Sequence, residues 1–310
     1  MNQEKVFSGK ITGVVIAVIV CALWGSLYPF VKIGYSSFGI AGGDIPTIML
    51  FAGCRFAVSG AVLFTYHFAK EKKVSIPAKK YMMLMLLSSF SSIILHYFFT
   101  YTALAIGEGS KSAIIKQVGF LFLSCFAFLF VKEDKFSLKK LAAGILGFLG
   151  IVVTSFDGGK FSFALGDVFL VLASFCSVIS TVLSKEIVKK VNPLYSTAFG
   201  QLFGGIVLCI AGLSLGGRIT HIDMNALFVF AYICTASILA YSLWSILIKY
   251  NDLSKLSVIK FTEPLFAVIL SGIFLGENIF KLNYLIALVI ILAAILLVNL
   301  RRKTDECKHI

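Results

Sequence analysis

Two ionisable residues, Lys260 and Glu263, lie within residues 254–277, an apolar stretch long enough to cross a bilayer as a helix. Their spacing of three places both side chains on one face of a helix. A charge at mid-membrane costs roughly 2.5–3.5 kcal/mol on insertion scales, so such residues usually face a bundle interior or a wet cavity. We interpret the pair either as a structural ion pair or as a binding site in which Glu263 also takes up and releases a proton.

Pro264 directly follows Glu263 and weakens the backbone of the same helix. Proline lacks an N–H, so the carbonyl of Lys260, one turn earlier, loses its helical hydrogen bond. We therefore expect a hinge at Pro264. Pro29 predicts a second kink, in the apolar run at residues 11–34.

Residues 110–133 form a similar stretch, 144 positions upstream of residues 254–277. Lys116 corresponds to Lys260, but Gly119 stands where the later stretch has Glu263. Lys116 therefore needs a partner from another helix or from a ligand, and an anionic ligand group would satisfy it. The alternatives are pairing with Glu263 across the two stretches and snorkelling to the nearby membrane surface.

Aromatic side chains with polar tips suit the wall of a cavity for an organic molecule. The candidates on the apolar runs are Trp24, Tyr28, Tyr97, Tyr101, Tyr241 and Trp244. His96 is a candidate for proton coupling, although a hydrogen-bonded core histidine is the commoner case. Arg55 is expected to tether helices through backbone carbonyls, and Lys32 to snorkel at the end of its helix.

The composition identifies a membrane protein that crosses the bilayer several times. Of 310 residues, 59% are hydrophobic and 14% charged, whereas soluble domains are nearer a quarter charged. The net charge of +13 arises from basic residues at the ends of apolar runs, which is typical of membrane topology and not of a nucleic-acid surface. No metal-ligand spacing is present, and we expect neither metal nor cofactor.

Hydropathy predicts an all-α fold with ten transmembrane helices. The expected spans are about 11–34, 46–69, 79–104, 110–131, 137–156, 166–187, 193–215, 224–249, 254–275 and 280–300. With the N-terminus in the cytoplasm, 20 of the 28 basic residues fall in inner segments and only Lys111, Lys160, Arg218 and Lys281 in outer loops. This asymmetry predicts a cell-membrane protein with both termini cytoplasmic.

The ten spans divide into two sequence repeats of five, residues 1–156 and 157–310. Besides the two stretches above, Pro46, Gly53 and Phe56 correspond to Pro193, Gly200 and Phe203, and Tyr97 corresponds to Tyr241. An odd number of spans per repeat inserts the second copy upside down. Inverted repeats of this kind are typical of secondary transporters.

The chain resembles the EamA-type members of the drug/metabolite transporter superfamily. The resemblance rests on Ala22-Leu23-Trp24-Gly25-Ser26, Arg55-Phe56, Gly166-Asp167, Glu263-Pro264-Leu265-Phe266-Ala267 and Leu275-Gly276-Glu277. It implies a ten-helix bundle that works by alternating access and transports, often exports, amino acids or other small metabolites. The family often has proline at the position of Phe120, so symmetric hinges are not implied for this chain.

The leading hypothesis is a secondary transporter for a small organic metabolite, with the bilayer as its other partner and a homodimer left open. Interior basic residues (Lys32, Arg55, Lys116 and Lys260) outnumber the one interior carboxylate, Glu263, which favours an amino acid or a related carboxylate. Export follows from the resemblance alone. The alternatives are a multidrug, cation or nucleoside-type efflux carrier and, more remotely, an intramembrane enzyme or a passive channel. Because no H-E-x-x-H, G-x-S-x-G or paired membrane aspartates occur, we expect no enzyme.

Overall fold

The structure, a computed structural model, describes residues 7–71, 76–119, 163–251, 262–278 and 281–299. It also describes 142, 145–146, 149–150, 152–153, 156–157, 160–161, 256 and 259–260. Most of the predicted fourth and fifth spans, including Phe120 and Glu133, lie outside these residues. The count of ten spans therefore stays a prediction.

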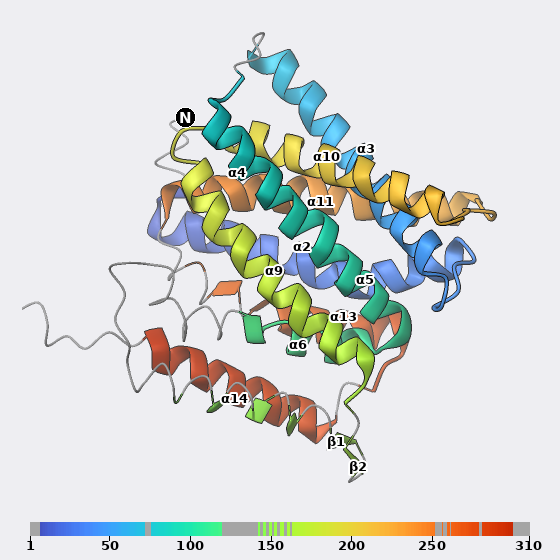
Figure 1. The fold of residues 1–310 in the computed structure, drawn as a ribbon. Coiled ribbons are helices and arrows are strands. Elements are labelled where there is room, and N and C mark those ends of the chain that lie inside the picture. The colour runs from blue at the N-terminus through green and yellow to red at the C-terminus, as the bar shows by residue number, and fades with distance from the viewer. Residues whose placement is uncertain are drawn as a thin grey trace, which may run out of the picture.

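The described chain is a helical bundle (Figure 1). Its long helices are α2 (Lys10–Ser37), α3 (Ile45–Glu71), α4 (Lys79–Ser89) continued by η1 (Phe90–Leu95) and α5 (His96–Ile106), α9 (Leu165–Ile187), α10 (Pro193–Ser214) and α11 (Met224–Tyr250). Shorter helices are α6 (Gly109–Ile115), α13 (Thr262–Leu275) and α14 (Leu282–Asn299). Six of the spans are long and apolar enough to cross a membrane, which confirms a multi-pass membrane protein.

Sequence reasoning placed the ends of these six spans within three residues of the observed ends. It missed a short antiparallel pair, β1 (Phe156–Asp157) with β2 (Lys160–Phe161), in which Phe156 faces Phe161. Pro29 lies inside α2. Pro264 lies in the first turn of α13, which begins at Thr262. Whether either proline acts as a hinge stays a prediction.

The third span is interrupted by a π-helical segment, η1. Proline and glycine are absent from it, and four serines, Ser88, Ser89, Ser91 and Ser92, lie at or beside its start. Such π-segments within α-helices occur frequently at functional sites. The π-segment therefore indicates a functional site in the space between this span and α9, α10 and α11.

Glycines allow α3 and α10 to pack backbone against backbone. A Cβ added at Gly205 of α10 would lie 2.2 Å from the amide nitrogen of Ala57, and one at Gly60 of α3 would lie 2.3 Å from that of Leu202. Small residues let membrane helices approach this closely. The contact fixes α3, and with it Arg55, beside the second half of the chain.

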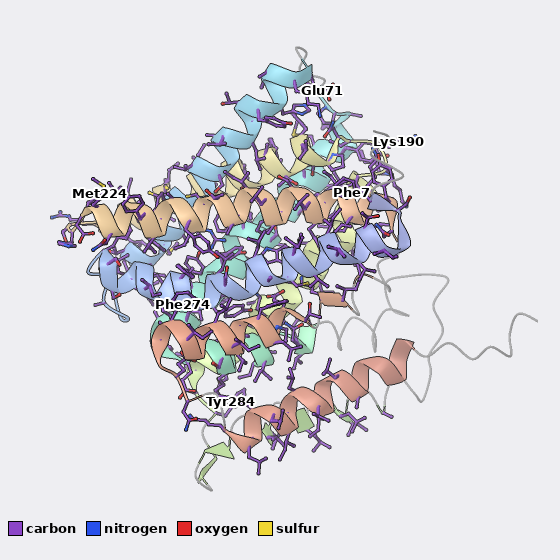
Figure 2. All side chains as sticks on the ribbon, turned by 180° about the vertical axis from the view of Figure 1, so that it is seen from behind. Phe7, Glu71, Lys190, Met224, Phe274 and Tyr284 are labelled. Atoms are coloured by element: carbon purple, nitrogen blue, oxygen red, sulfur yellow. The ribbon has the colours of Figure 1, made fainter. Side chains whose placement is uncertain are left out.

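The two ends of the bundle are identified by the residues found there. We call one the Glu277 end; it holds residues 38–44, 107–108, 215–223 and 276–278. The opposite end, named after Lys185, holds residues 188–192 and Asn251. Figure 2 shows Met224, the first residue of α11, at the Glu277 end, and Phe7 and Lys190 at the Lys185 end.

Candidate functional site

A cavity of about 120 Å³ lies inside the bundle. One water needs roughly 10–15 Å³ by this measure, so the space holds several waters or a small organic molecule. On α9, α10 and α11 the lining residues fall in the halves nearer the Lys185 end, between 177 and 184, 196 and 201, and 241 and 248. The cavity is therefore displaced toward the Lys185 end.

The candidate residues from distant parts of the sequence converge on this one cavity. Its lining includes Trp24, Tyr28, His96, Tyr97, Tyr101, Lys116, Tyr241, Trp244, Lys260 and Glu263. The charged side chains in the lining are Arg55, Lys116, Lys260 and Glu263. Three cations thus face a cavity with one carboxylate. That these residues bind substrate stays a prediction.

Glu263 is held against α2 by a glycine one turn before Tyr28. A Cβ at Gly25 would lie 2.8 Å from the carbonyl oxygen of Glu263 and 2.7 Å from the Cβ of Phe266, so only glycine allows this approach. Tyr28 then donates a hydrogen bond to Oε1 of Glu263 over 3.3 Å. The Glu263 residue is only 3% exposed, so a buried carboxylate is positioned at the cavity wall.

The two lysines at matched sequence positions lie over aromatic rings. Lys260 Nζ is 4.8 Å from the ring centre of Trp24 and 5.5 Å from that of Trp244. Lys116 Nζ is 5.5 Å from the ring centre of Tyr28. These distances fit cation–π interactions, which grow stronger as water is excluded.

Lys116 differs from the other lysines of the bundle interior in its polar contacts. Within the described part of the chain its ammonium makes no ion pair or hydrogen bond, so the predicted alternative of a pair with Glu263 is not formed in this conformation. Its backbone carbonyl accepts a hydrogen bond from Ser174 of α9 over 2.7 Å, which fixes the start of the side chain. The ammonium is left available to an anion in the cavity.

Arg55 is fully buried and joins three helices. Its Nε donates to Ser237 Oγ of α11 over 2.7 Å, and Nη1 donates to the Tyr101 hydroxyl of α5. The expected tethering is therefore made through hydroxyl groups and not through backbone carbonyls. Nη2 has no hydrogen-bond partner among the described residues, and Arg55 lines the cavity, which sequence reasoning had not expected.

An aromatic wall closes one side of the cavity. The rings of Trp24 and Trp244 meet edge to face at 5.1 Å, and Trp24 meets Tyr241 in the same way at 5.7 Å. The Tyr241 hydroxyl donates to the Tyr97 hydroxyl over 2.6 Å. The sequence identified these side chains because they recur on the apolar spans.

His96 lies in the cavity wall and is also tied to the backbone. Its Nδ1 is 2.8 Å from the carbonyl oxygen of Ala173 in α9. A carbonyl only accepts, so Nδ1 carries the proton. This bond fits the interpretation of His96 as a hydrogen-bonded core histidine. Proton coupling by His96 stays a prediction and would use the other ring nitrogen, Nε2.

Sequence reasoning missed the hydroxyl-rich part of the cavity. Its lining residues are Ser88, Ser89, Ser92, Ser177, Ser180, Thr181, Ser184, Ser196, Thr197, Gln201 and Ser245. The usable signal was the spacing of Ser177, Ser180 and Ser184, which places three hydroxyls on one face of α9.

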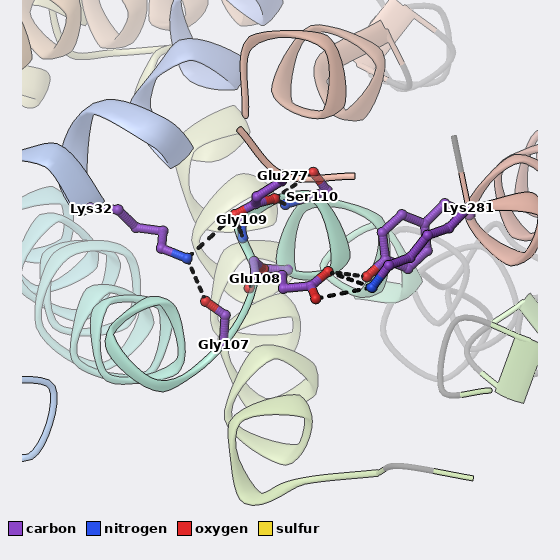
Figure 3. A network of polar contacts seen from close by, with 9 residues as sticks. Lys32, Gly107, Glu108, Gly109, Ser110, Glu277 and Lys281 are labelled. Atoms are coloured by element: carbon purple, nitrogen blue, oxygen red, sulfur yellow. Dashed lines mark hydrogen bonds and ion pairs between the residues drawn. The ribbon is translucent and has the colours of Figure 1, made fainter. Parts of the chain in front are cut away.

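A network of polar contacts joins the helices at the Glu277 end (Figure 3). Glu277, which follows α13, accepts hydrogen bonds from the amides of Gly109 and Ser110 at the start of α6, over 2.9 and 3.0 Å. Ser110 Oγ donates to the same carboxylate over 2.7 Å. Lys32 Nζ of α2 lies 3.3 Å from Glu277 and donates to the Gly107 carbonyl over 2.9 Å.

Two further ion pairs continue the network along the same end. Lys281 pairs with Glu108 at 3.1 Å, and Lys111 pairs with Asp167 at 2.8 Å. Lys32, which the sequence placed among the interior cations, thus belongs to the network and not to the cavity. The network joins α2, α6, α9, α13 and α14.

The Glu277 carboxylate is held in its charged form. Burial alone would raise its pKa, but the hydrogen bonds from Ser110 and Gly109 and the charge of Lys32 outweigh burial and lower the pKa below its usual range. Glu277 is therefore charged and paired at neutral pH.

The Lys185 end carries a smaller contact of the same kind. Lys185 Nζ of α9 donates to the carbonyls of Ile248 and Asn251 at the end of α11, over 2.7 and 2.8 Å. It joins α9 to α11 beside the cavity.

Fold and site define a class of protein: a multi-pass helical membrane protein with a small polar cavity enclosed by its helices. Within that class the chain belongs to the EamA-like transporter family, which matches residues 11–156 and again 164–300. It is therefore a transporter, with a small-molecule substrate and a bilayer as its surroundings. The sequence resemblance to this family is confirmed.

Relatives are transporters of the same kind. The chain is 27% identical to "Uncharacterized transporter YvbV" of Bacillus subtilis over 84% of this chain and 86% of the relative. It is 24% identical to "Uncharacterized inner membrane transporter YedA" of Escherichia coli K12 over 93% and 90%. A crystal structure at 19% identity aligns with a TM-score of 0.68 over 93% of this chain and 98% of that one, which shows a shared fold.

Proposed function

We propose that this transporter moves a small organic carboxylate, an amino acid or a related acid, across the cytoplasmic membrane by alternating access, and that it exports it. The observation that carries the proposal is the charge of the cavity lining: Arg55, Lys116 and Lys260 against Glu263. A cavity with excess positive charge attracts an anion and repels a cation. This charge weighs against cation efflux, the first alternative.

The roles of the cations differ. Arg55 is fixed by its bonds to Ser237 and Tyr101, so it contributes a fixed charge more than a movable ligand. Lys116, with its ammonium over Tyr28 and without a polar partner among the described residues, is the group that an incoming carboxylate would engage. Glu263 beside Tyr28 is the candidate for binding a substrate amine or a coupling proton.

The direction of access follows from the charge distribution along the chain. The basic loops predict that the Lys185 end faces the cytoplasm. The network around Glu277 then closes the outer side, and the cavity, displaced toward the Lys185 end, is positioned to load from the cytoplasm. Loading from within is the arrangement that an exporter needs.

The two-repeat organisation, 1–156 and 157–310, is part of the proposal. Its support is that the family matches the chain twice, and that Tyr97 and Tyr241, equivalent by sequence, hydrogen bond to each other. Equivalent residues touch only near a two-fold axis. Lys32 falls near Lys185 when the first and sixth spans are aligned, and Asn251 lies 144 positions after Gly107, the offset of the two stretches. Lys32 bonds to Gly107 at one end and Lys185 to Asn251 at the other, as inverted repeats require.

The proposal is tested by comparing metabolite pools in cells that lack the chain, express it, or express Lys116→Met. Export predicts that one or more carboxylates fall inside and rise outside on expression, and that Lys116→Met abolishes the change. Lys189→Met, which alters an exposed lysine outside the cavity, is the matched control and should behave as the parent. No change in any acid pool, with the protein present in the membrane, contradicts the proposal.

A further inference from the structure

The cavity has a second, uncharged region, to which the excess of cations in the lining assigns no role. Hydroxyls from two spans line this region, Ser88 and Ser92 on α4 and η1, and Ser177, Ser180 and Ser184 on α9. Ser196 of α10 lies in the same lining. We call these six residues, together with Gln201, the hydroxyl compartment.

The side chains of this compartment have unused hydrogen-bonding capacity. Serines in helices usually bond back to a carbonyl one turn earlier, as Thr181 does to Ser177 over 2.8 Å. None of the six serine hydroxyls makes a hydrogen bond within the part of the chain that the structure describes. They are free to bond to a ligand or to water.

Gln201 provides the independent observation. It lines the cavity and is 1% exposed, yet neither its amide nitrogen nor its amide oxygen has a hydrogen-bond partner among the described residues. A buried polar group left unpaired keeps its full desolvation penalty, which a partner would relieve. An amide with both a donor and an acceptor unpaired is suited to a hydroxyl group, which both accepts and donates.

The compartment and Lys116 lie at different positions along the cavity. From Ser88 to Tyr97 the lining of the third span extends nine residues, about 13 Å at 1.5 Å per residue. Ser184 and Ser196 each lie three residues from the helix end nearest Lys185, at Ile187 and Pro193, whereas Lys116 lies seven residues from Gly109 at the Glu277 end.

We propose that the hydroxyl compartment binds the hydroxyl groups of an elongated hydroxylated acid whose carboxylate engages the cations. This deepens, and rests on, the proposed transport of a carboxylate: it names the substrate class as polyhydroxylated acids. The alternative is that the serines only hold a column of water, in which case hydroxyl groups on the ligand gain nothing.

The test uses three probes on the full chain in lipid nanodiscs: gluconate, hexanoate and sorbitol. Gluconate and hexanoate share chain length and carboxylate and differ in hydroxyl groups, whereas sorbitol has hydroxyls without a charge. Several added hydrogen bonds predict that gluconate binds roughly tenfold or more tighter than hexanoate, and that sorbitol, which lacks the carboxylate, does not bind measurably. Affinities are measured by titration calorimetry.

Variants separate the compartment from the cation site. Ser180→Ala with Ser184→Ala should weaken gluconate toward the hexanoate value and leave hexanoate unchanged, while Lys116→Met should weaken both acids. Ser214→Ala, an exposed serine of α10 outside the cavity, is the control and should change neither.

The outcomes distinguish the two claims. Equal affinity for the two acids, or a gluconate preference that survives the double serine change, overturns the hydroxyl compartment and leaves carboxylate transport standing. If neither acid binds a folded parent protein, the hydroxyl compartment is overturned, and carboxylate transport is decided separately by the metabolite comparison. Circular dichroism and melting of each variant confirm that it is folded.

Discussion

Changing Glu277 to glutamine should weaken the polar network at the Glu277 end and increase access to the cavity from that end. Glu277 accepts three hydrogen bonds from Gly109 and Ser110 and pairs with Lys32. Glutamine is close in size, but its NH₂ group would face an N–H donor and it carries no charge for Lys32. Hydrogen bonds to a charged group contribute about 1.5–3 kcal/mol, so losing the charge and one acceptor costs about 3 kcal/mol, roughly a hundredfold in the opening equilibrium.

The opening is measured as access to the cavity from the Glu277 end. Val31 is buried and lines the cavity on α2, so Val31→Cys reports reagent that passes the network. With a membrane-impermeant maleimide applied to cells from outside, Glu277→Gln should raise the labelling rate of this cysteine by up to about a hundredfold, the full shift in the opening equilibrium. The chain with native Val31 gives the background from its own cysteines.

Asp44→Asn is the matched control for that experiment. Asp44 also accepts a backbone hydrogen bond at this end of the bundle, from Thr47 over 3.1 Å, but within its own segment. It should leave the labelling rate of Val31→Cys unchanged. An unchanged rate in folded Glu277→Gln, or an equal increase in Asp44→Asn, would refute the closing role of the Glu277 network.

Three further outcomes are expected. Gly205→Ala should lower stability by about 1–3 kcal/mol because its Cβ would overlap the backbone of Ala57. Gly200→Ala should not, because the nearest atom to its Cβ would be 4.0 Å away. Equal melting temperatures of the two variants in detergent would contradict the close packing of α3 on α10. Glu263→Gln should abolish any dependence of transport on a pH gradient in proteoliposomes, and a surviving dependence removes Glu263 as the coupling group. Because the pKa of Glu277 is lowered in the folded protein, the stability that its charge adds to this end of the bundle is fully present above the ordinary carboxyl pKa of about 4.3. That stability is lost as the pH falls through the lower pKa of the folded state. The rate at which Val31→Cys is labelled from outside the cell, divided at each pH by the rate of a free thiol because only the thiolate reacts, should therefore be equal at pH 7 and about pH 5 and rise only below about pH 4. A rise of this ratio near neutral pH would show that another group controls closure.

The sequence predicted the spans well because their ends are written locally. Apolar runs are bounded by basic residues, or by a residue that caps the start of a helix, such as Asn192 or Asp223. Each of these signals lies within a few positions of the boundary that it predicts. The convergence of Trp24, Lys116 and Lys260 on one cavity was also predictable, since charged and polar-tipped residues avoid lipid.

What the sequence could not supply are contacts between distant segments. Lys32 and Glu277 are 245 positions apart, and nothing near either residue indicates that they meet. The role of Arg55 was mistaken in part for the same reason, since its partners Ser237 and Tyr101 lie on other spans. Serines of the hydroxyl compartment were overlooked because single serines are common in membrane helices and gain meaning only when several helices face one space.

Counterflow in proteoliposomes shows whether the cations of the cavity bind the carboxylate of the substrate. Vesicles loaded with an acid pool identified from the metabolite comparison are assayed for uptake of the labelled acid and of its uncharged amide. We expect saturable counterflow of the acid, little of the amide, and loss of acid counterflow in Lys116→Met but not in Lys189→Met. Equal counterflow of acid and amide, or full acid counterflow in Lys116→Met, would contradict it.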